Sequence, residues 1–347
     1  MVMRAFIIGI LFGTLCFIWF AQELDWSALW LQLQDLQIAW VVLAVLALLL
    51  EFVCRAIRWK IILRPISPTI RVRDLFIAQI IGATTNTLLP LRLGEVAKPL
   101  VASNRSKLPF LSVTATSVME RVYDLFGMVT VLVFMVLFLQ PSITPAPEQA
   151  NLVHNLQLYG GIFGLIAIVA MGVFFYLASQ RQQARNIFVS ITSIAPQPIQ
   201  RFFLRLFDGF VEGLGNSTDT KGMWQAGLWS VILWLNGAGA IYFLFQAFSL
   251  DLPFGAACFI GVAIALTVAL PQAPGFIGVF HVAIENTIIL WGQDALLSKS
   301  FALVFWAVSF LPVTIIGIVF IAREKLSWKD IKNIKNVHSD GEPKPPQ

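Results

Sequence analysis

The chain has 347 residues, of which 58% are hydrophobic and only 12% are charged. Soluble domains carry about 25% charged residues, so this composition excludes a soluble globular protein and predicts an all-α, multi-pass membrane protein. The formal net charge is +5, but Lys and Arg lie scattered between apolar runs, which argues against nucleic acid as a partner. The three cysteines show no metal-ligand spacing, so we expect no metal site.

Apolar runs that approach the length of a membrane span recur along the chain. They occupy residues 5–20, 38–54, 110–139, 156–178, 223–248, 254–270, 277–292 and 299–321. The first run follows Arg4 like a signal peptide, but Trp19 stands where a cleavage site needs a small residue, so we expect an uncleaved span. We predict about six full spans in one transmembrane domain, 1–323, followed by a short basic tail, 324–347, that is disordered.

The distribution of Lys and Arg predicts which side of the membrane each loop faces, because short cytoplasmic loops accumulate basic residues. Loops 21–37, 141–155 and 249–253 contain neither residue, whereas loops 55–73 and 179–222 are basic. We therefore expect a multi-pass protein of the cell (inner) membrane, with its N and C termini in the cytoplasm.

Two segments should enter the membrane without crossing it. The short apolar run 75–89 has basic stretches on both sides, so we expect a re-entrant segment that returns to the cytoplasmic side. The number of crossings then requires residues 254–292 to enter and leave from the other side, either as two short spans or as a re-entrant hairpin. Broken backbone at membrane depth is tolerated only where protein or a water-filled cavity covers it, so the two segments together suggest a cavity.

A cluster of charged residues follows the first of these segments. The stretch NTLLPLRLGEVAKPLV contains Arg92, Glu95 and Lys98 between Pro90 and Pro99, in a chain that otherwise avoids charge. A charge inside a span costs about 2.5 to 3.5 kcal/mol on insertion scales, so such residues usually face the interior of a bundle or a wet cavity. We expect these three side chains to lie at the exit of the first re-entrant segment.

The segment 110–124 predicts a helix with a polar ribbon on one face. The ribbon consists of Ser112, Thr116, Glu120 and Asp124, with Ser117 and Arg121 beside them. Arg121 and Asp124 are spaced to pair, whereas Glu120 and Asp124 repel one another unless a cation from Arg92 or Lys98 lies between them. The alternative is that this segment lies at the cytoplasmic interface, where the ribbon is a solvated helix face.

The stretch LPQAPGFIGVFHVAIENTI predicts a second helix, which begins after Gly278. A free helix N-terminus in a membrane cavity attracts anions, and discontinuous helices of transporters use this effect. His281 and Glu285 lie four residues apart on the helix. They are therefore either candidate proton carriers or a mutual hydrogen-bonded pair.

The stretch EFVCRAIRWK has the features of an ordinary span end. Glu51 lies four residues before Arg55, which is the spacing of a helical ion pair, and the stretch closes with Arg58, Trp59 and Lys60. Basic and aromatic residues of this kind usually anchor a span at the membrane interface. We interpret these residues as anchors and not as part of a site.

Motifs for the commonest enzyme chemistries are absent from the sequence. It contains no G-x-x-x-x-G-K-[ST], no G-x-G-x-x-G, no H-E-x-x-H and no G-x-S-x-G. Its soluble stretches are too short to form a catalytic domain. We therefore expect no cofactor, no ATP hydrolysis and no enzymatic activity.

Three motifs, in this order, resemble those of a known family. LPLRLGEVAKPLV, SVMERVYDLFG and PQAPGFIGVFHVAIE follow the patterns P-x-R-x-G-E-x-x-[RK], E-R-x-x-D and P-x-x-P-G-x-x-G of the lysylphosphatidylglycerol synthase transmembrane (flippase-like) family. The resemblance covers about residues 5 to 325, although this chain has His281 where many members have Glu or Arg. It implies a helical bundle with two re-entrant hairpins around a hydrophilic cavity, through which a charged lipid headgroup passes.

This resemblance implies a function in lipid translocation. The substrate would be an aminoacylated phospholipid, another phospholipid or a polyprenyl-phosphate lipid, made by a separate lipid-modifying enzyme because the soluble aminoacyltransferase domain of the best-known members is not found in this sequence. The candidate substrate-binding residues are Asn86, Arg92, Glu95, Lys98, Glu120, Arg121, Asp124, Pro274, Gly275, Gly278, His281 and Glu285. The alternative is a non-transporting partner or scaffold for a lipid synthase or glycosyltransferase, and either type of protein is compatible with a homo-oligomer.

Overall fold

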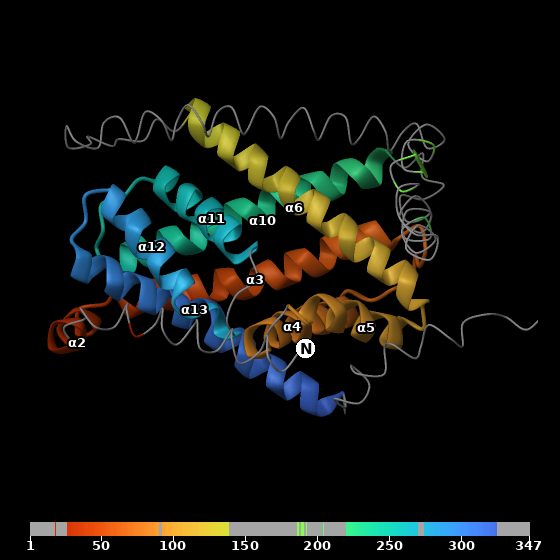
Figure 1. The fold of residues 1–347 in the computed structure, drawn as a ribbon, viewed down its shortest axis with the longest axis horizontal. Helices are drawn as coiled ribbons and strands as arrows, with labels where there is room; N and C mark the ends of the chain where they lie inside the picture. The colour runs from red at the N-terminus through yellow and green to blue at the C-terminus, as the bar shows by residue number, and fades with distance from the viewer. Residues whose placement is uncertain are drawn as a thin grey trace, which may run out of the picture.

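The computed structural model describes residues 26–89, 92–138, 220–269 and 274–324, together with a few isolated positions. Every secondary-structure element in this part of the chain is a helix, which confirms the predicted fold class (Figure 1). The expected spans 5–20 and 156–178 and nearly all of the expected tail lie outside the described residues.

Four long helices form the frame of the bundle. They are α3 (Ile38–Leu63), α6 (Phe110–Phe138), α10 (Thr220–Ala247) and α13 (Ala295–Arg323), each 26 to 29 residues long. At 1.5 Å per residue they reach about 40 Å, which exceeds the ~30 Å hydrocarbon core of a bilayer. Within the described part of the chain, α3, α10 and α13 are long and apolar enough to cross a membrane. A short helix, α2 (Trp26–Gln34), precedes them.

Helices α3 and α10 pack antiparallel along the centre of the molecule. The Gln37 N–H donates to the Ala247 carbonyl at 3.0 Å, and the Asn236 side chain donates to the Ala47 carbonyl at 2.8 Å. The first residue of α3 is therefore close to the last residue of α10. The apolar run 38–54 predicted that this span ends at residue 54, but helix α3 continues to Leu63.

The first predicted re-entrant segment is one arm of a helical hairpin. Helix α4 (Val72–Leu88) is followed by α5 (Gly94–Ser106), and the two helices pack against each other. At about 26 and 20 Å, each is shorter than the hydrocarbon core. Helix α4 begins beside the end of α3, and α5 ends just before α6 begins. The hairpin therefore enters and leaves at the same end of the bundle.

Glycines bring the two arms of this hairpin into direct backbone contact. A Cβ atom added at Gly94 would lie 1.9 Å from the Gly82 carbonyl oxygen, and one added at Gly82 would lie 2.7 Å from the Cβ of Lys98. Side chains larger than hydrogen are therefore excluded from both positions. This close approach fixes the spacing between α4 and the turn of α5 that carries Lys98.

The segment 254–292 is also a helical hairpin, which either of the two alternatives from the sequence, two short spans or a re-entrant segment, would produce. It consists of α11 (Phe254–Ala269), a 3-10 turn η1 (Pro274–Phe276) and α12 (Val279–Leu290). Its arms, about 24 and 18 Å long, are each shorter than the hydrocarbon core, as expected for short spans and for a re-entrant segment alike. Helix α12 begins after Gly278, as predicted, and the η1 turn contacts α4 of the first hairpin.

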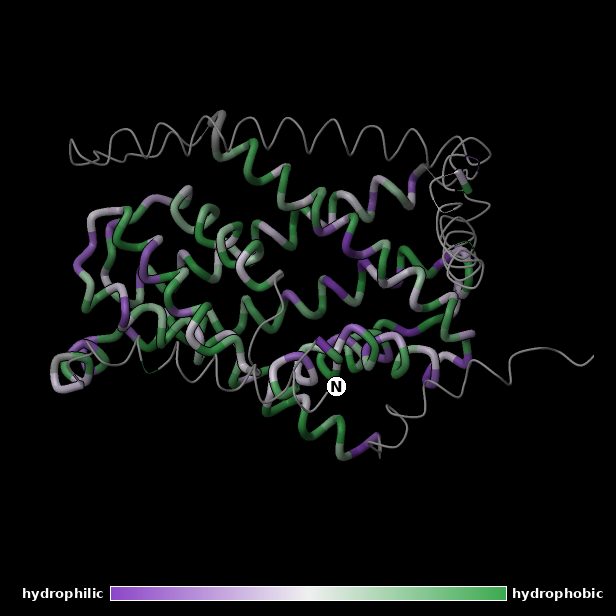
Figure 2. Tube along the Cα trace, in the orientation of Figure 1, coloured by the Kyte–Doolittle hydropathy of each residue, from purple (hydrophilic) through white to green (hydrophobic). Residues whose placement is uncertain are grey.

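Hydrophilic residues concentrate inside the part of the bundle where α3 and α6 pass each other, and along α4 and α5 (Figure 2). The opposite part, around α11 to α13, has an apolar core in which aliphatic side chains pack around the rings of Phe245, Phe280, Phe301 and Phe305. We call the part formed by α3 to α6 the polar half because it holds these charged side chains, although its helices also pack around an apolar core that includes Trp59, Leu75 and Tyr123.

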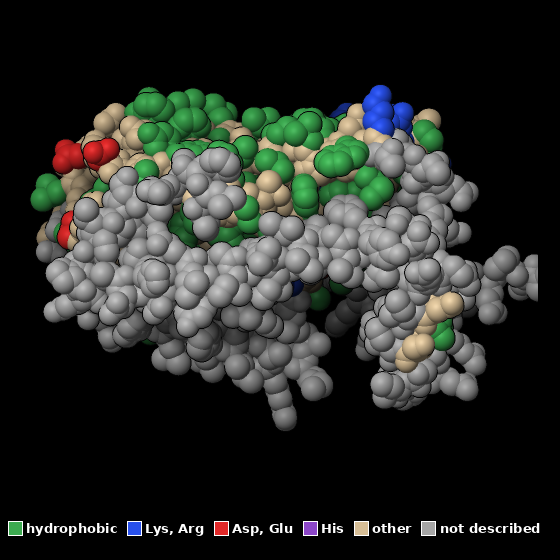
Figure 3. Space-filling model, turned by 90° about the horizontal axis from the view of Figure 1, so that it is seen from above, with side chains coloured by type: hydrophobic (Ala, Val, Ile, Leu, Met, Phe, Trp, Pro, Cys, Tyr) green, Lys and Arg blue, Asp and Glu red, His purple; other side chains and the backbone are tan. Residues whose placement is uncertain are grey.

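Exposed charges of opposite sign lie at opposite ends of the long axis. In Figure 3 acidic side chains lie at one end and basic side chains at the other, with hydrophobic side chains between them. The exposed acidic residues at the turns before α3, α11 and α13 are Asp35, Asp251 and Asp294, and exposed basic residues at the other end are Arg64, Arg71, Lys107 and Lys221. We call these the acidic end and the basic end. The first hairpin opens toward the basic end and the second toward the acidic end.

Candidate functional site

Helix α3 contributes three charged residues to the interior of the polar half. Arg55 pairs with Glu51 at 2.6 Å, as its spacing predicted, and the guanidinium of Arg58 is completely buried. The prediction that Arg58 and Trp59 anchor a span at the interface is wrong, because α3 continues past them and both side chains have no exposed surface.

Arg58 is the cation that lies between the two carboxylates of α6. Its Nη1 is 2.7 Å from Asp124, its Nη2 is 3.7 Å from Glu120, and Nη1 also donates to the Ser230 hydroxyl of α10. The sequence predicted that such a cation was needed and offered Arg92 or Lys98; Lys98 does pair with Glu120, but the sequence did not identify Arg58. Glu120 is buried, so the solvated-face alternative for the polar ribbon is wrong at this position.

Helix α5 supplies a second partner for Glu120. Lys98 is buried and bonds to Glu120 Oε2, and the Gln79 amide donates to Oε1 at 2.8 Å. The Lys98 ammonium also lies 4.6 Å from the centre of the Trp59 ring, which adds a cation–π contact. Glu120 therefore has hydrogen-bond donors on both oxygens, and it connects α3, α4 and α5 to α6.

The outer part of the cluster is a set of three partly exposed side chains, Arg92, Glu95 and Arg121, which we call the rim. Glu95 accepts from Arg121 at 2.5 Å and lies 3.5 Å from Arg92, and Arg121 also pairs with Asp124 at 3.3 Å, as its spacing predicted. The side chains of Arg92 and Glu95 are each 33% exposed and that of Arg121 is 47% exposed. The rim is therefore the most exposed part of the cluster.

The remaining candidate of the first hairpin, Asn86, holds the hairpin turn in place. Its Oδ1 accepts the backbone N–H of Gly94 at 2.7 Å, which satisfies a free donor in the first turn of α5. In the same turn Arg92 has a φ of 53°, a left-handed conformation that is unusual for a residue with a side chain. Asn86 thus positions the residues that precede Glu95.

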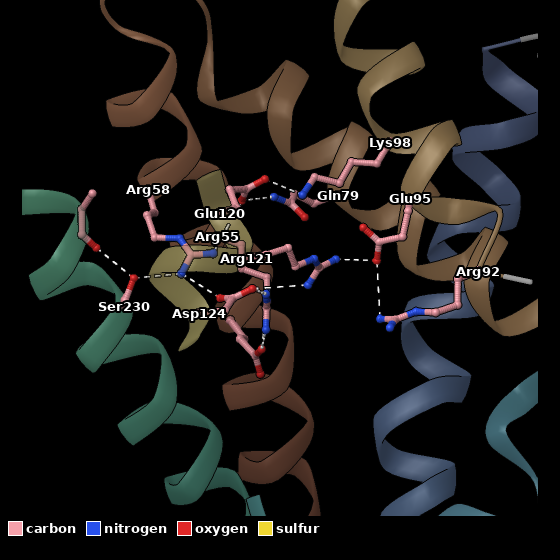
Figure 4. Close-up of polar contacts among 12 residues, drawn as sticks. Arg55, Arg58, Gln79, Arg92, Glu95, Lys98, Glu120, Arg121, Asp124 and Ser230 are labelled. Carbon is pink, nitrogen blue, oxygen red and sulfur yellow. Dashed lines mark hydrogen bonds and ion pairs between the residues drawn. The ribbon is translucent and has the colours of Figure 1, made fainter. Parts of the chain in front are cut away.

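Taken together, the cluster holds slightly more positive than negative charge. Figure 4 shows its side chains converging from α3, α5, α6 and the turn before α5. The basic members are Arg55, Arg58, Arg92, Lys98 and Arg121, and the acidic members are Glu51, Glu95, Glu120 and Asp124. Two buried donors of Arg58, Nε and Nη2, have no hydrogen-bond acceptor among the described residues. An additional anionic group therefore fits this cluster electrostatically.

The candidates of the second hairpin form a separate group. Gly275 and Gly278 have φ values of 72° and 88°, so both occupy backbone conformations that favour glycine, and the Gly275 carbonyl accepts from the Trp306 indole at 2.7 Å. His281 is buried, and its Nδ1 accepts the Gly278 N–H at 3.3 Å. Glu285 lies 3.8 Å from Lys299 of α13.

Sequence reasoning missed five residues of the first group: Glu51, Arg55, Arg58, Gln79 and Ser230. A signal for the arginines was present, because Glu51, Arg55 and Arg58 follow one another at helical spacing and would extend one polar face of α3. The signal was misread because an apolar run ending in basic residues usually marks the end of a span. No pattern in the sequence distinguishes Gln79 or Ser230 from other polar residues.

Comparison with known proteins identifies the family. Residues 6–317 match the family model described as "Lysylphosphatidylglycerol synthase TM region". A relative in Methanothermobacter thermautotrophicus, described as a "UPF0104 membrane protein", is 25% identical over 295 residues, which cover 81% of this chain and 83% of the relative. No solved structure matches. Since the family match covers most of the chain, from its first apolar run to the last helix, the protein belongs to the lysylphosphatidylglycerol synthase transmembrane-region family of membrane proteins.

Proposed function

We propose that this protein moves a lipid with a charged, phosphate-containing headgroup from one membrane leaflet to the other, and that the charged cluster of α3, α5 and α6 receives the headgroup. The observation that carries the proposal is the burial of this cluster inside a bundle of membrane-length helices. Burying ion pairs seldom increases stability over apolar packing, so a cluster of this size favours a role in binding.

Each part of the cluster has a role in this proposal. The rim arginines, Arg92 and Arg121, meet the phosphate first, and Glu95, which they already share, is displaced toward a cationic part of the headgroup. Arg58 offers further donors deeper in the bundle. Glu120 and Lys98 hold the helices around this path, since each is the other's partner.

Nucleotide hydrolysis is not part of this proposal, because the given sequence contains no phosphate-binding loop. Exchange would run down a concentration gradient or follow the membrane potential or a proton gradient. His281 and Glu285 remain the candidate proton carriers.

Leaflet exchange by purified protein in lipid vesicles tests the proposal. A fluorescent phospholipid is included in both leaflets, and a membrane-impermeant quencher then reports the rate at which inner-leaflet lipid becomes accessible. We expect Arg92→Ala to slow exchange at least tenfold through the loss of a charge-assisted contact with the headgroup. Glu120→Ala should slow it at least as much, because buried Lys98 loses the partner that holds the helices around the path. Arg73→Ala, which removes an exposed arginine in the first turn of α4, is the matched control and should exchange like the unmodified protein.

The scaffold alternative predicts a different result. The purified protein would then show no exchange, and it would co-purify in a stable complex with a lipid synthase or glycosyltransferase from its own membrane. Normal exchange by both Arg92→Ala and Glu120→Ala would contradict the proposed role of the cluster while leaving translocation intact.

A further inference from the structure

The described helices form two units with the same order of elements. The first unit is a long helix, a hairpin and a long helix: α3, α4 with α5, and α6. The second unit repeats this order with α10, α11 with α12, and α13. Helix α3 runs from the acidic end to the basic end, whereas α10 runs the opposite way, and the two hairpins open at opposite ends. This is the arrangement of an inverted-topology repeat, with a pseudo-twofold axis in the membrane plane.

The packing of the helices obeys the same twofold relation. Interchanging the units pairs α3 with α10, α4 with α11, α5 with α12, and α6 with α13. The packing of α3 on α4 then becomes that of α10 on α11, α13 on α4 becomes α6 on α11, and α6 on α10 becomes α13 on α3, and all six of these packings are present. The packing of α3 on α10 becomes itself. The two units are therefore alike in packing as well as in order, and α3 and α10 lie at the axis.

Equivalent packings differ in extent, so the structure is one of two arrangements that the axis relates. Helix α13 packs more extensively on α4 than on α3, whereas its counterpart α6 packs more extensively on α10 than on α11. Glycine permits both of the closer crossings. A Cβ added at Gly317 of α13 would lie 2.6 Å from the Cβ of Thr84 in α4. One added at Gly127 of α6 would lie 2.7 Å from the Ser230 carbonyl oxygen of α10.

The packing of α13 on the first hairpin ends in a group of ion pairs at the basic end. Arg105 of α5 pairs with Asp74 of α4 at 2.5 Å and also with Glu324, which follows the last residue of α13. These three side chains, which we call the latch, are between 18% and 25% exposed. Partly exposed ion pairs contribute little to stability, because water replaces the partner when they open. The latch therefore holds α13 on the hairpin through contacts that open at little cost.

We propose that the protein has a second state in which the two units swap their packing. Helix α13 then leaves α4 and packs on α3, and α6 leaves α10 and packs on α11, while α3 and α10 keep their contact at the axis. Because α6 carries Glu120, Arg121 and Asp124, the swap moves three members of the charged cluster toward the second hairpin, which opens at the acidic end. This inference rests on the proposed function and deepens it, since it names the motion that passes a headgroup across the bundle.

Spin-label distances test the motion without any transport. Arg71→Cys at the start of α4 and Ala322→Cys at the end of α13, both exposed, are labelled in protein whose three native cysteines are replaced. In bilayers we expect two distance populations, and Arg105→Gln should increase the longer one at least about threefold because it removes the latch. Labels at Arg64→Cys and Lys221→Cys, at the basic ends of α3 and α10, are the control and should give one distance. A single distance for the first pair that Arg105→Gln leaves unchanged, or two distances for the control pair, would overturn the proposal.

Cross-linking tests whether transport needs the motion. The Thr84 hydroxyl donates to the Val313 carbonyl at 3.1 Å between α4 and α13, and the Asn236 amide donates to the Ala47 carbonyl at 2.8 Å between α10 and α3. A short, reducible cross-link between Thr84→Cys and Val313→Cys should slow leaflet exchange at least about tenfold, and reduction should restore the rate. The matched cross-link between Asn236→Cys and Ala47→Cys joins the helices at the axis and should leave the rate within about twofold.

The outcomes separate this inference from the proposed function. A normal rate with the first cross-link in place, or equal slowing by both cross-links, would reject the packing swap and leave translocation standing. Failure of the unmodified protein to exchange any lipid would reject the proposed function, and the spin-label distances would then decide on the second state by themselves.

Discussion

At the scale of single residues, the cluster depends on one buried arginine. Arg58 lies between Asp124 and Glu120 and has no exposed surface, so no solvent replaces it when it is removed. Glu120 retains Lys98, but Asp124 loses its shortest contact and then faces a second carboxylate. Breaking a buried pair from one side is strongly destabilising for this reason.

We therefore predict that Arg58→Met destabilises the protein by about 3 to 5 kcal/mol. Thermal unfolding in detergent micelles measures the change. Arg64→Met, which removes an exposed arginine just past the end of the same helix, should leave the unfolding temperature unchanged. The double variant Arg58→Met/Asp124→Asn should recover part of the loss, and a double variant as unstable as the single one would disprove the charge explanation.

A second residue-scale prediction concerns Asn86, whose side chain accepts from the first turn of α5. Asn86→Ala should lower stability by about 1 kcal/mol, the usual effect of losing such a contact. Asn86→Asp keeps the acceptor oxygen and should remain close to the original in unfolding temperature. If Asn86→Ala instead keeps full stability and loses only leaflet exchange, Asn86 contacts the lipid and not the turn.

At the scale of elements, the first hairpin depends on the absence of side chains where its arms cross. The added Cβ at Gly94 meets backbone, which cannot turn aside as a side chain can. Any substitution there must push α5 away from α4. Because α5 carries Glu95 and Lys98, the displacement reaches both the rim and the buried part of the cluster.

Gly94→Ala should accordingly lower both the unfolding temperature and the rate of leaflet exchange. Gly239→Ala is the matched control, since it lies in the middle of α10 with no atom within 4 Å of the added Cβ. It should raise stability by up to about 1 kcal/mol, as alanine does at an unstrained helical site. Equal effects of the two substitutions would show that the crossing tolerates a side chain.

At the scale of the whole molecule, the separation of charge sets an orientation in the membrane. From the positive-inside rule we predict that the basic end faces the cytoplasm and the acidic end faces the other side. A cytoplasmic C terminus agrees with this prediction, because α13 runs from the acidic end to the basic end. In a bacterial host, a green fluorescent protein fused after Arg323 should fluoresce and alkaline phosphatase fused after Asp251 should be active. Active phosphatase after Arg323 would reverse the orientation.

Some parts of the fold follow from the sequence. The apolar runs predict most ends of the long helices to within a few residues, because lipid-facing helices must be continuously apolar over a fixed length. The exception is the end of α3, which lies nine residues beyond the predicted one. The charge on the loops alone required residues 254–292 to return to the side they came from, and the two short helices α11 and α12 agree with this. The pairing of Arg121 with Asp124 also follows, since their spacing on one helix fixes their separation.

What the sequence by itself determined is therefore local: which segments are helical, where they break, and which charges share a face. Only the tertiary structure decided that Arg58 bridges the two carboxylates of α6, that Asn86 caps α5, and that the two hairpins meet. These contacts join segments far apart in the chain, so they depend on how whole helices cross. A polar residue carries the same local signal whether its helix face turns toward lipid, water or a buried carboxylate, and only packing distinguishes the three.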